Sequence, residues 1–487
     1  MPNAHPARLT FFIPAMIAVL LLAAYAGTRG LTFDSIWYDE WRSLVYIGKT
    51  TINDGANIPG TPGRVIAESD ALNPPAYYVL LSVWGTVAGT DTPVLRYFSV
   101  LLGVLTTAVV YRVGAEVQSR EVGLAAAAIF GTMAMTSVFF HEMRTYSLAM
   151  LVVMLHLWLY WRCLRDDARW WHYAAFTGVI GLALHTHYTA VLMMGGTFVY
   201  HVVFVRRKWF MVGLYFAAVL LVVPWALVVL SAGAVENVQD RANTAMPVTQ
   251  ILTTLLQMVG NDSRYFWLVG VPLLLALGRG RLLWVHVLVG ITAYLTLNAL
   301  VPFACCRRYM LVMLPGFALL AAVGITRYRW LAIGFVALWI GSGFYTSRDL
   351  TYAHNVTNTP RWHYPWADIR AGVPALDEND RVLALLPGGI NVWTHEGLAE
   401  HFFPGGEADV LATFRAIPRE DSLNELLLKT VGSEHLYVAY KKSWPAYHLV
   451  DMQELLSLAF VSCGTVLETA DAHLLLYVST QQTCPPA

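Results

Sequence analysis

Long apolar runs recur along the first two thirds of the chain, separated by short polar or basic stretches. Many of these runs hold about 17 to 20 residues, the length that an α-helix needs to cross a hydrocarbon core of about 30 Å. The pattern therefore predicts about eleven membrane-spanning helices. They lie at residues 9–26, 97–111, 122–140, 146–160, 171–184, 189–205, 210–230, 266–277, 283–302, 310–325 and 331–344.

Two runs have a second interpretation. Residues 9–26 follow Arg8 and end in Ala24-Tyr25-Ala26, which is also the pattern of a cleavable signal peptide. The length of the run and the spans that follow it favour a retained first helix. Residues 74–88 are short, begin with two prolines and have no flanking basic residue. We expect them to form an interfacial or re-entrant helix in the first outer loop.

The basic residues predict the orientation. If residues 74–88 do not span, twelve loop arginines and lysines share one face, about twice as many as on the other. They are Arg112, Arg120, Arg162, Arg165, Arg169, Arg206, Arg207, Lys208, Arg279, Arg281, Arg327 and Arg329. The positive-inside rule makes this face cytoplasmic, so the N-terminus is expected inside and the C-terminus outside.

The composition agrees with a multi-pass membrane protein, which we expect in the plasma (inner) membrane. Hydrophobic residues make up 57% of the 487 residues and charged residues only 13%, against roughly 25% in soluble domains. The net charge is zero, which gives no indication of a nucleic-acid partner. The expected surroundings are membrane lipids.

From about residue 347 the composition changes, and Asp, Glu, Pro and Gly become frequent. Short β-type runs at 381–386, 435–440 and 473–478 alternate with helical patterns at 366–376 and 422–430. We therefore predict an all-α polytopic membrane bundle at 1–345 and a small extracytoplasmic α/β domain at 346–487. Cys463 and Cys484 fall in this tail, where they either form a disulfide or remain two free thiols.

Polar groups collect at the outer ends of the predicted helices. Ionisable groups at membrane level are costly, so a cluster of both signs on one face indicates a functional site. Salt bridges between helices are the alternative interpretation. The cluster contains Asp34, Asp39, Glu40, Asp70, Asn73, His141, Glu142, Arg144, His185, His187, Arg307, Arg308 and Tyr309.

Asp39 and Glu40 lie about a dozen residues after the first span, between Trp37-Tyr38 and Trp41. Aromatic residues of this kind mark the membrane interface. A carboxylate at the water-facing end of a bundle can accept a proton from an acceptor hydroxyl. A solvated pair of loop carboxylates is the alternative.

Several segments together resemble the superfamily C glycosyltransferases with polyprenyl-phosphate donors. The resemblance covers residues 1 to about 345, in the same order as in the family. Within this superfamily, the segments most resemble those of the protein O-mannosyltransferases and of the bacterial lipid A aminoarabinose and galacturonic acid transferases. The segments are Trp37-Tyr38-Asp39-Glu40, residues 73–81 (NPPAYYVLL), 95–101 (LRYFSVL), 142–148 (EMRTYSL), 184–188 (LHTHY) and Arg308-Tyr309.

The resemblance implies an inverting transfer of a sugar from a polyprenyl-phosphate donor to a lipid, glycan or protein acceptor. Asp39 would be the general base, and Glu40 would orient it or help to hold a metal ion. Arg308, with Arg307, would pair with the donor phosphate, since a fixed cation stabilises charge that develops there. Tyr309 and His187 would hydrogen-bond the same oxygens.

The second outer loop, with Glu142 and Arg144, is a further part of the implied site. Asp39 and Glu142 are candidate ligands for Mg²⁺ or Mn²⁺, which prefer oxygen donors. Two residues depart from the family pattern: Asn73 stands where many relatives have His, and Tyr146 where the aminoarabinose-type enzymes have Asp.

Two other functions use similar parts. A transporter or flippase of lipid-linked sugars would also need cations for a phosphate, but such proteins often show two matching halves. No half of this sequence resembles the other. A glycan polymerase or ligase has nearly the same substrates, and the sequence does not separate it from a transferase of single sugars.

Overall fold

The chain divides into two units in the computed structural model. One contains Met1–Leu31 and Gly60–Asn358, the other Thr32–Pro59 and Thr359–Ala487. The structure describes residues 6–32, 36–48, 73–231, 246–261, 265, 267–301, 303–304, 307–349, 364–387, 392–413, 428–430, 432–442, 453–454, 456–469 and 472–485. Asp34, Asp70 and most of the predicted helix at 422–430 lie outside these ranges.

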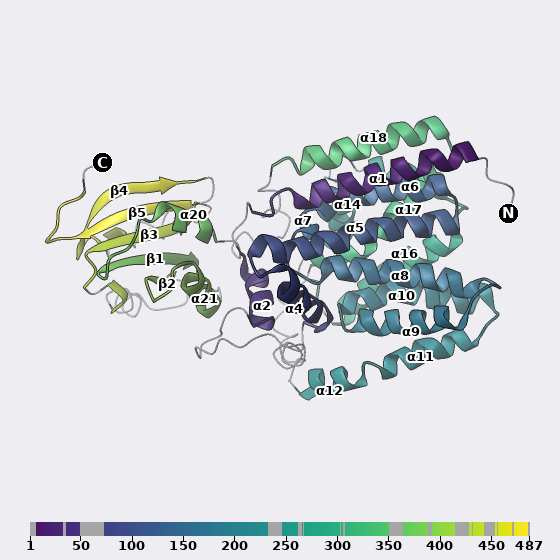
Figure 1. The fold of residues 1–487 in the computed structure, drawn as a ribbon, viewed down its shortest axis with the longest axis horizontal. Helices are drawn as coiled ribbons and strands as arrows, with labels where there is room; N and C mark the ends of the chain where they lie inside the picture. Colours follow the sequence, from purple (N-terminus) through teal and green to yellow (C-terminus); the bar gives the residue numbers. More distant parts are fainter. Residues whose placement is uncertain are drawn as a thin grey trace. The chain divides into compact units, whose positions relative to one another are not determined.

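The described part of the first unit consists of helices, and each apolar run of the sequence overlaps at least one of them. The long helices run side by side along one axis (Figure 1). The α-helices are α1 (Pro6–Thr28), α4 (Ala76–Ala88), α5 (Thr92–Val117), α6 (Arg120–Gly131), α7 (Ala134–Phe140), α8 (Tyr146–Leu164), α9 (Trp170–Leu184), α10 (Tyr188–Tyr200), α11 (Phe210–Leu220), α12 (Val223–Ser231), α14 (Val248–Val259), α15 (Trp267–Ala276), α16 (Arg281–Leu300), α17 (Leu314–Ile325) and α18 (Arg329–Thr346). A π-helical turn, η1 (His201–Val205), extends α10, and a 3₁₀ segment, η3 (Arg307–Met313), precedes α17.

Six of these segments are long and apolar enough to cross a membrane, counting only the described residues. They are Phe11–Thr28, Thr92–Val117, Tyr146–Leu164, Tyr188–Val205, Arg281–Leu300 and Arg307–Ile325. A seventh span would be the pair α6 and α7, which bends by 67° at its break. The prediction of a polytopic helical membrane protein is confirmed at this level.

The break between α6 and α7 is stabilised by Asn261, which follows α14. Its Oδ1 accepts a hydrogen bond from the Ala134 backbone N–H at 3.0 Å. Its Nδ2 donates to Ser342 Oγ at 2.8 Å and to the Trp339 carbonyl at 3.3 Å. A broken helix is tolerated in a membrane bundle where neighbouring groups satisfy the exposed backbone. The sequence predicted one continuous span at 122–140, because the run is apolar throughout.

Close helix pairs in this unit depend on glycine. A Cβ on Gly114 of α5 would lie 2.6 Å from Cα of Gly123 in α6. A Cβ on Gly196 of α10 would lie 2.7 Å from the His286 carbonyl oxygen in α16. Small residues let membrane helices approach until their backbones touch. These contacts bring α5 against α6 and α10 against α16.

The second unit contains a five-stranded mixed sheet of order β2-β1-β3-β5-β4. Its strands are β1 (Asp380–Pro387), β2 (Ala408–Thr413), β3 (His435–Lys441), β4 (Phe460–Glu468) and β5 (Ala472–Ser479). The pairs β1·β2 and β1·β3 are parallel, whereas β3·β5 and β4·β5 are antiparallel. The three predicted strands are confirmed as β1, β3 and β5, and β2 and β4 were not predicted.

Three helices accompany this sheet. Helix α20 (Trp366–Gly372) contacts β4 and β5, and α21 (Val392–Phe402) contacts β2. Helix α2 (Tyr38–Tyr46) of the same unit contacts α21. The sheet core contains Leu383, Leu436, Val438, Phe460 and Tyr477, all buried.

Cys463 and Cys484 form a disulfide, which answers the question that the sequence left open. Their Cα atoms are 5.4 Å apart, and the bond fastens the end of the chain to β4. Cys163 is buried and is the free cysteine within the described residues.

Candidate active site

Three loops of the first unit that the sequence predicts at the outer face meet near Arg144. The Arg144 guanidinium is buried and donates from Nη1 to the Tyr78 hydroxyl at 2.8 Å, and from Nη2 to Asn73 Oδ1 at 3.0 Å. The Tyr78 hydroxyl itself donates to Asn73 Oδ1 at 3.4 Å. The Ala76 N–H donates to the His185 carbonyl at 2.9 Å. The predicted first, second and third loops are therefore joined by hydrogen bonds.

His187 lies beside two cations. Burial, Arg144 and Arg308 together lower the pKa of His187 from 6.5 to about 3. Its ring lies between those of Tyr146 and Tyr309, with centroid distances of 5.7 Å and 5.9 Å. Because burial and two nearby cations all oppose a positive charge on the ring, His187 is neutral at physiological pH.

The tautomer of His187 follows from its position at the N-terminus of α10. Nδ1 accepts a hydrogen bond from the Thr189 N–H at 3.3 Å and lies 2.7 Å from Thr189 Oγ1. In a neutral imidazole whose Nδ1 is the acceptor, the proton is on Nε2. His187 thus offers an Nε2–H donor that carries no charge.

The segment before α17 carries Arg307, Arg308 and Tyr309 at the start of η3, and all three are partly exposed. Arg308 Cζ lies 5.9 Å from the Tyr309 ring centroid, and Arg307 Nη2 donates to Gln257 Oε1 at 3.2 Å. Asn298 fixes the preceding segment, since its Oδ1 accepts from the backbone of Ala304 at 2.8 Å. The sequence-predicted residues Arg308, Tyr309, His187 and Arg144 thus belong to one group around His187.

Asp39 and Glu40 belong to the second unit, in the first turn of α2. Both are buried, with 7% and 1% of their surfaces exposed. Carboxylates in a first helical turn are stabilised by the helix dipole. Ser43 donates to the Asp39 carbonyl at 3.1 Å, which ties the two ends of the turn together.

The helix that carries Asp39 and Glu40 packs closely on α21. A Cβ on Gly397 would lie 2.9 Å from Cε2 of the buried Trp41 indole. Only a residue without a side chain leaves room for the indole at this distance. Sequence reasoning missed Gly397, because a single glycine in a helical pattern has no distinguishing signal.

Glu142 is buried in the loop between α7 and α8, and its carbonyl accepts from the Arg144 N–H at 2.7 Å. Among the described residues, no three His, Cys, Asp or Glu side chains lie together as a metal-binding group. Asp39 and Glu142 belong to different units. The suggested Mg²⁺ or Mn²⁺ site therefore stays a prediction, and no chemical step below depends on it.

Comparison with known families supports the resemblance. Residues 73–231 match the family model described as dolichyl-phosphate-mannose-protein mannosyltransferase. The matched segment contains Asn73, Tyr78, Glu142, Arg144 and His187. The match covers 159 of the 487 residues, so it shows a likeness of this segment to that family of membrane glycosyltransferases. No curated protein sequence is significantly similar to the chain.

Solved structures show a similar fold. ArnT from Cupriavidus metallidurans in its apo state matches with a TM-score of 0.57 at 12% identity, over 96% of this chain and 98% of that chain. The same protein bound to undecaprenyl phosphate matches with a TM-score of 0.56 at 13% identity, over 99% and 100%. The oligosaccharyltransferase of Archaeoglobus fulgidus, tethered to an acceptor peptide, gives 0.49 at 12%, over 96% and 74%. The bundle with a C-terminal sheet domain is thus an ArnT-like fold.

Proposed function

We propose that this protein is a glycosyltransferase that transfers one sugar, with inversion, from a polyprenyl phosphate to an acceptor hydroxyl at the outer face of the membrane. The observation that carries the proposal is the grouping of Arg308, Tyr309 and Tyr146 around His187, in the loops that Arg144 joins. A donor whose leaving group is a phosphate gains negative charge there during transfer. The ArnT structure of similar fold was crystallised with undecaprenyl phosphate.

Arg308 and Arg307 are the proposed phosphate ligands. As the bond between the sugar C1 and the phosphate oxygen breaks, negative charge grows on that oxygen, and preorganised donors stabilise it. Guanidinium groups suit phosphate because their N–H donors form a planar fork. His187 Nε2–H and the Tyr309 hydroxyl add neutral hydrogen bonds.

Asp39 is the proposed general base. The acceptor oxygen forms a bond to C1 while the C1–O bond to phosphate breaks, and the hydroxyl proton moves to the Asp39 carboxylate. The polyprenyl phosphate leaves with the bonding electrons. Glu40 would orient Asp39 or the acceptor. General-base catalysis is typically worth about 10² to 10⁴ in rate.

We further propose about eleven spans, a cytoplasmic N-terminus and an extracytoplasmic domain at 346–487. The asymmetry of loop arginines supports this orientation. The Cys463–Cys484 disulfide supports it independently, because disulfides persist in oxidising compartments.

The test uses purified protein in detergent with synthetic polyprenyl-phosphate sugars and candidate acceptors. We expect Asp39→Asn to lose about 10² to 10⁴ in turnover while donor binding remains. Arg308→Ala should lose about 10² to 10³ in turnover and bind donor more weakly. Asp91→Asn removes an exposed carboxylate elsewhere and is the matched control. Turnover after treatment with EDTA tests whether the reaction requires Mg²⁺ or Mn²⁺.

Other outcomes would point elsewhere. Normal turnover by Asp39→Asn would move the base to Glu40 or Glu142. If the wild type releases no sugar but moves the lipid across liposomes, the transporter or flippase is the correct function. Products longer than one sugar would indicate a polymerase or ligase.

A further inference from the structure

A charged cavity of about 630 Å³ lies at the end of the bundle opposite the candidate site. It is lined by the first half of α1, the C-terminal ends of α5 and α8, and the first residue of α6. Arg144 and Tyr146 precede or begin α8, whereas Arg162 and Arg165 end it. The helix between them has 19 residues, or about 28 Å at 1.5 Å per residue. This cavity is therefore separate from the proposed donor site.

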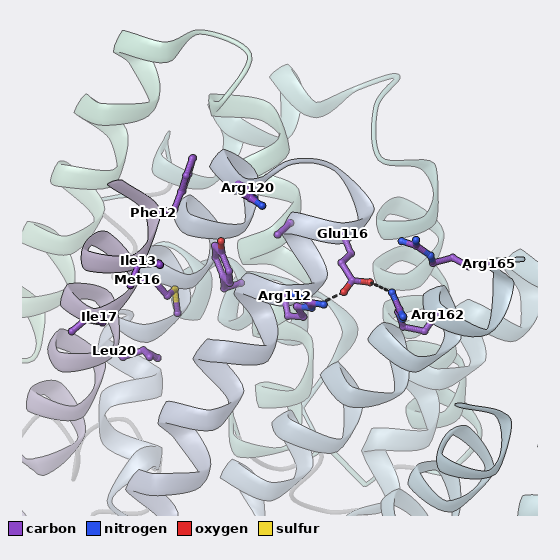
Figure 2. A pocket seen from close by; sticks show the side chains of 12 residues that line it. Phe12, Ile13, Met16, Ile17, Leu20, Arg112, Glu116, Arg120, Arg162 and Arg165 are labelled. Carbon is purple, nitrogen blue, oxygen red and sulfur yellow. Dashed lines mark ion pairs between the residues drawn. The ribbon is translucent and has the colours of Figure 1, made fainter. Parts of the chain in front are cut away.

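One wall of the cavity is basic. Figure 2 shows Glu116 between Arg112 and Arg162, with an ion pair to each. The distance from Arg162 Nη1 to Glu116 Oε2 is 3.7 Å, and Trp158 Nε1 donates to Glu116 Oε1 at 3.2 Å. Glu116 is thus neutralised, and it holds two guanidinium groups at the cavity wall.

The remaining two arginines leave the cavity positive. Arg165 pairs with Asp167 at 3.0 Å, although both side chains are well exposed. Arg120 is exposed and has no ion pair within the ranges that the structure describes. It begins α6, whose N-terminus carries Glu121 in its first turn and has its Val122 N–H capped by Ser119 Oγ at 3.3 Å. Four arginines and one glutamate line the cavity.

The other wall is apolar and faces lipid. In Figure 2, α1 presents Phe12, Ile13, Met16, Ile17 and Leu20 to the cavity. The surfaces of Ile13 and Ile17 are 59% and 52% exposed. On a membrane-spanning helix such exposed apolar side chains contact acyl chains. A ligand of this cavity can therefore be anionic at one end and hydrocarbon at the other.

We propose that the cavity binds an anionic phospholipid from the adjacent leaflet, which the proposed orientation makes the inner one. The phosphate would lie between Arg120, Arg112 and Arg162, and one acyl chain would follow Ile17 and Leu20 of α1. Basic pockets between membrane helices on the cytoplasmic side suit anionic headgroups. The bound lipid would join α1 to α5, α6 and α8.

The proposal is tested in nanodiscs of phosphatidylcholine, alone or with one third phosphatidylglycerol. Phosphatidylglycerol should raise the melting temperature of the wild type, and native mass spectrometry should show retained phosphatidylglycerol. Arg120→Gln should weaken this binding about fivefold, the effect of one surface cation. Arg279→Gln removes an exposed arginine of the same predicted face outside the cavity and should bind like wild type.

Three results would overturn it. Equal melting temperatures in both lipids for the wild type would mean that no anionic lipid binds. Equal weakening by Arg120→Gln and Arg279→Gln would mean a diffuse surface effect. Inorganic phosphate in pure phosphatidylcholine discs that reproduces the full stabilisation would identify a free anion as the ligand.

Discussion

The Arg144 guanidinium donates a 2.8 Å hydrogen bond to the Tyr78 hydroxyl, although 66 positions of sequence separate them. The Arg144 guanidinium and the Tyr78 hydroxyl both donate to Asn73 Oδ1 as well. The buried Arg144 is therefore hydrogen-bonded to two residues of the segment that precedes and begins α4. Such an arrangement holds the loop between α7 and α8, which contains Glu142, against the segment before α4. It also fixes one of the two cations that act on His187.

We predict that Tyr78→Phe destabilises the protein by about 1.5 to 3 kcal/mol, because hydrogen bonds to charged groups contribute this much when buried. Arg144→Lys should cost a similar amount, since one ammonium cannot replace the planar fork that reaches both partners. Thermal unfolding in detergent measures both. Tyr97→Phe, on a half-exposed tyrosine, is the control and should be neutral. Unchanged melting of Tyr78→Phe would contradict the prediction.

Gly397 is predicted to be a positioning residue for Asp39 and Glu40. Gly397→Ala forces the Trp41 indole away from α21, and overpacking of this kind costs about 1 to 3 kcal/mol. If Asp39 is the base, kcat should fall at least tenfold while KM for the donor stays nearly constant, because misplaced catalytic groups slow the chemical step.

Trp41→Phe supplies the decisive control for Gly397. The smaller ring leaves room for the new methyl group, so Trp41→Phe combined with Gly397→Ala should recover part of the lost kcat. Gly341→Ala, in a helix with open space around its Cα, should have no effect. A Gly397→Ala enzyme with normal kcat would show that this contact does not position the carboxylates.

The sequence predicted the helices well because the bilayer imposes one requirement, a long apolar run, on each span. It failed where that requirement does not apply. Helix α14 carries Thr249, Gln250, Thr253 and Gln257, so it was not recognised as an apolar run. The bend after Gly131 was invisible because its stabilising partner, Asn261, comes from another part of the chain.

The candidate site shows the same division. Arg308, Tyr309, His187 and Arg144 could be singled out by their charge and position at the helix ends. The role of Tyr78 could not, because an apolar helix with two tyrosines gives no sign of which hydroxyl meets a distant arginine. Nor could the sequence choose between a disulfide and two thiols for Cys463 and Cys484, since pairing depends on how β4 and the C-terminal segment meet.

Titration of His187 should not change the catalytic rate between pH 5 and 8, because its pKa is about 3 and it stays neutral over this range. It should instead affect stability. In the unfolded chain the His187 imidazole is protonated with a pKa of 6.5, whereas in the folded chain its pKa is about 3. Stability due to this group is therefore complete above pH 6.5 and falls as the pH decreases below it.

The measurement compares melting at pH 7 and pH 5. His187→Gln, which keeps a neutral donor and acceptor, should lose less stability over this interval than the wild type, by up to about 2 kcal/mol. Its kcat should fall less than that of Arg308→Ala, because one neutral hydrogen bond is weaker than a charged one. Parallel melting curves for His187→Gln and wild type would show that His187 is charged in the folded protein.

The Cys463–Cys484 disulfide closes a loop of 21 positions, for which chain entropy predicts about 3 kcal/mol of stabilisation. A double serine variant should melt earlier by a corresponding amount, and dithiothreitol should shift the wild type but leave the variant unchanged. Maleimide labelling after reduction should gain two thiols, with buried Cys163 unlabelled in both states. Full labelling of freshly isolated membranes without reductant would argue against an oxidising location.

Asn261 provides a test of the break between α6 and α7. It combines a left-handed backbone, with φ of 60°, with hydrogen bonds to Ala134 and Ser342. Asn261→Ala should lose about 2 to 4 kcal/mol, the sum of a lost helix cap and a non-glycine residue in the left-handed region. Asn261→Gly loses the same hydrogen bonds, but glycine adopts a positive φ without a steric penalty. This variant should therefore be more stable than Asn261→Ala by about 1 kcal/mol. Both variants should bind donor more weakly than wild type, because α7 leads directly into the loop that contains Arg144. Equal stability of the two variants would show that the left-handed backbone angle does not contribute to the loss of stability.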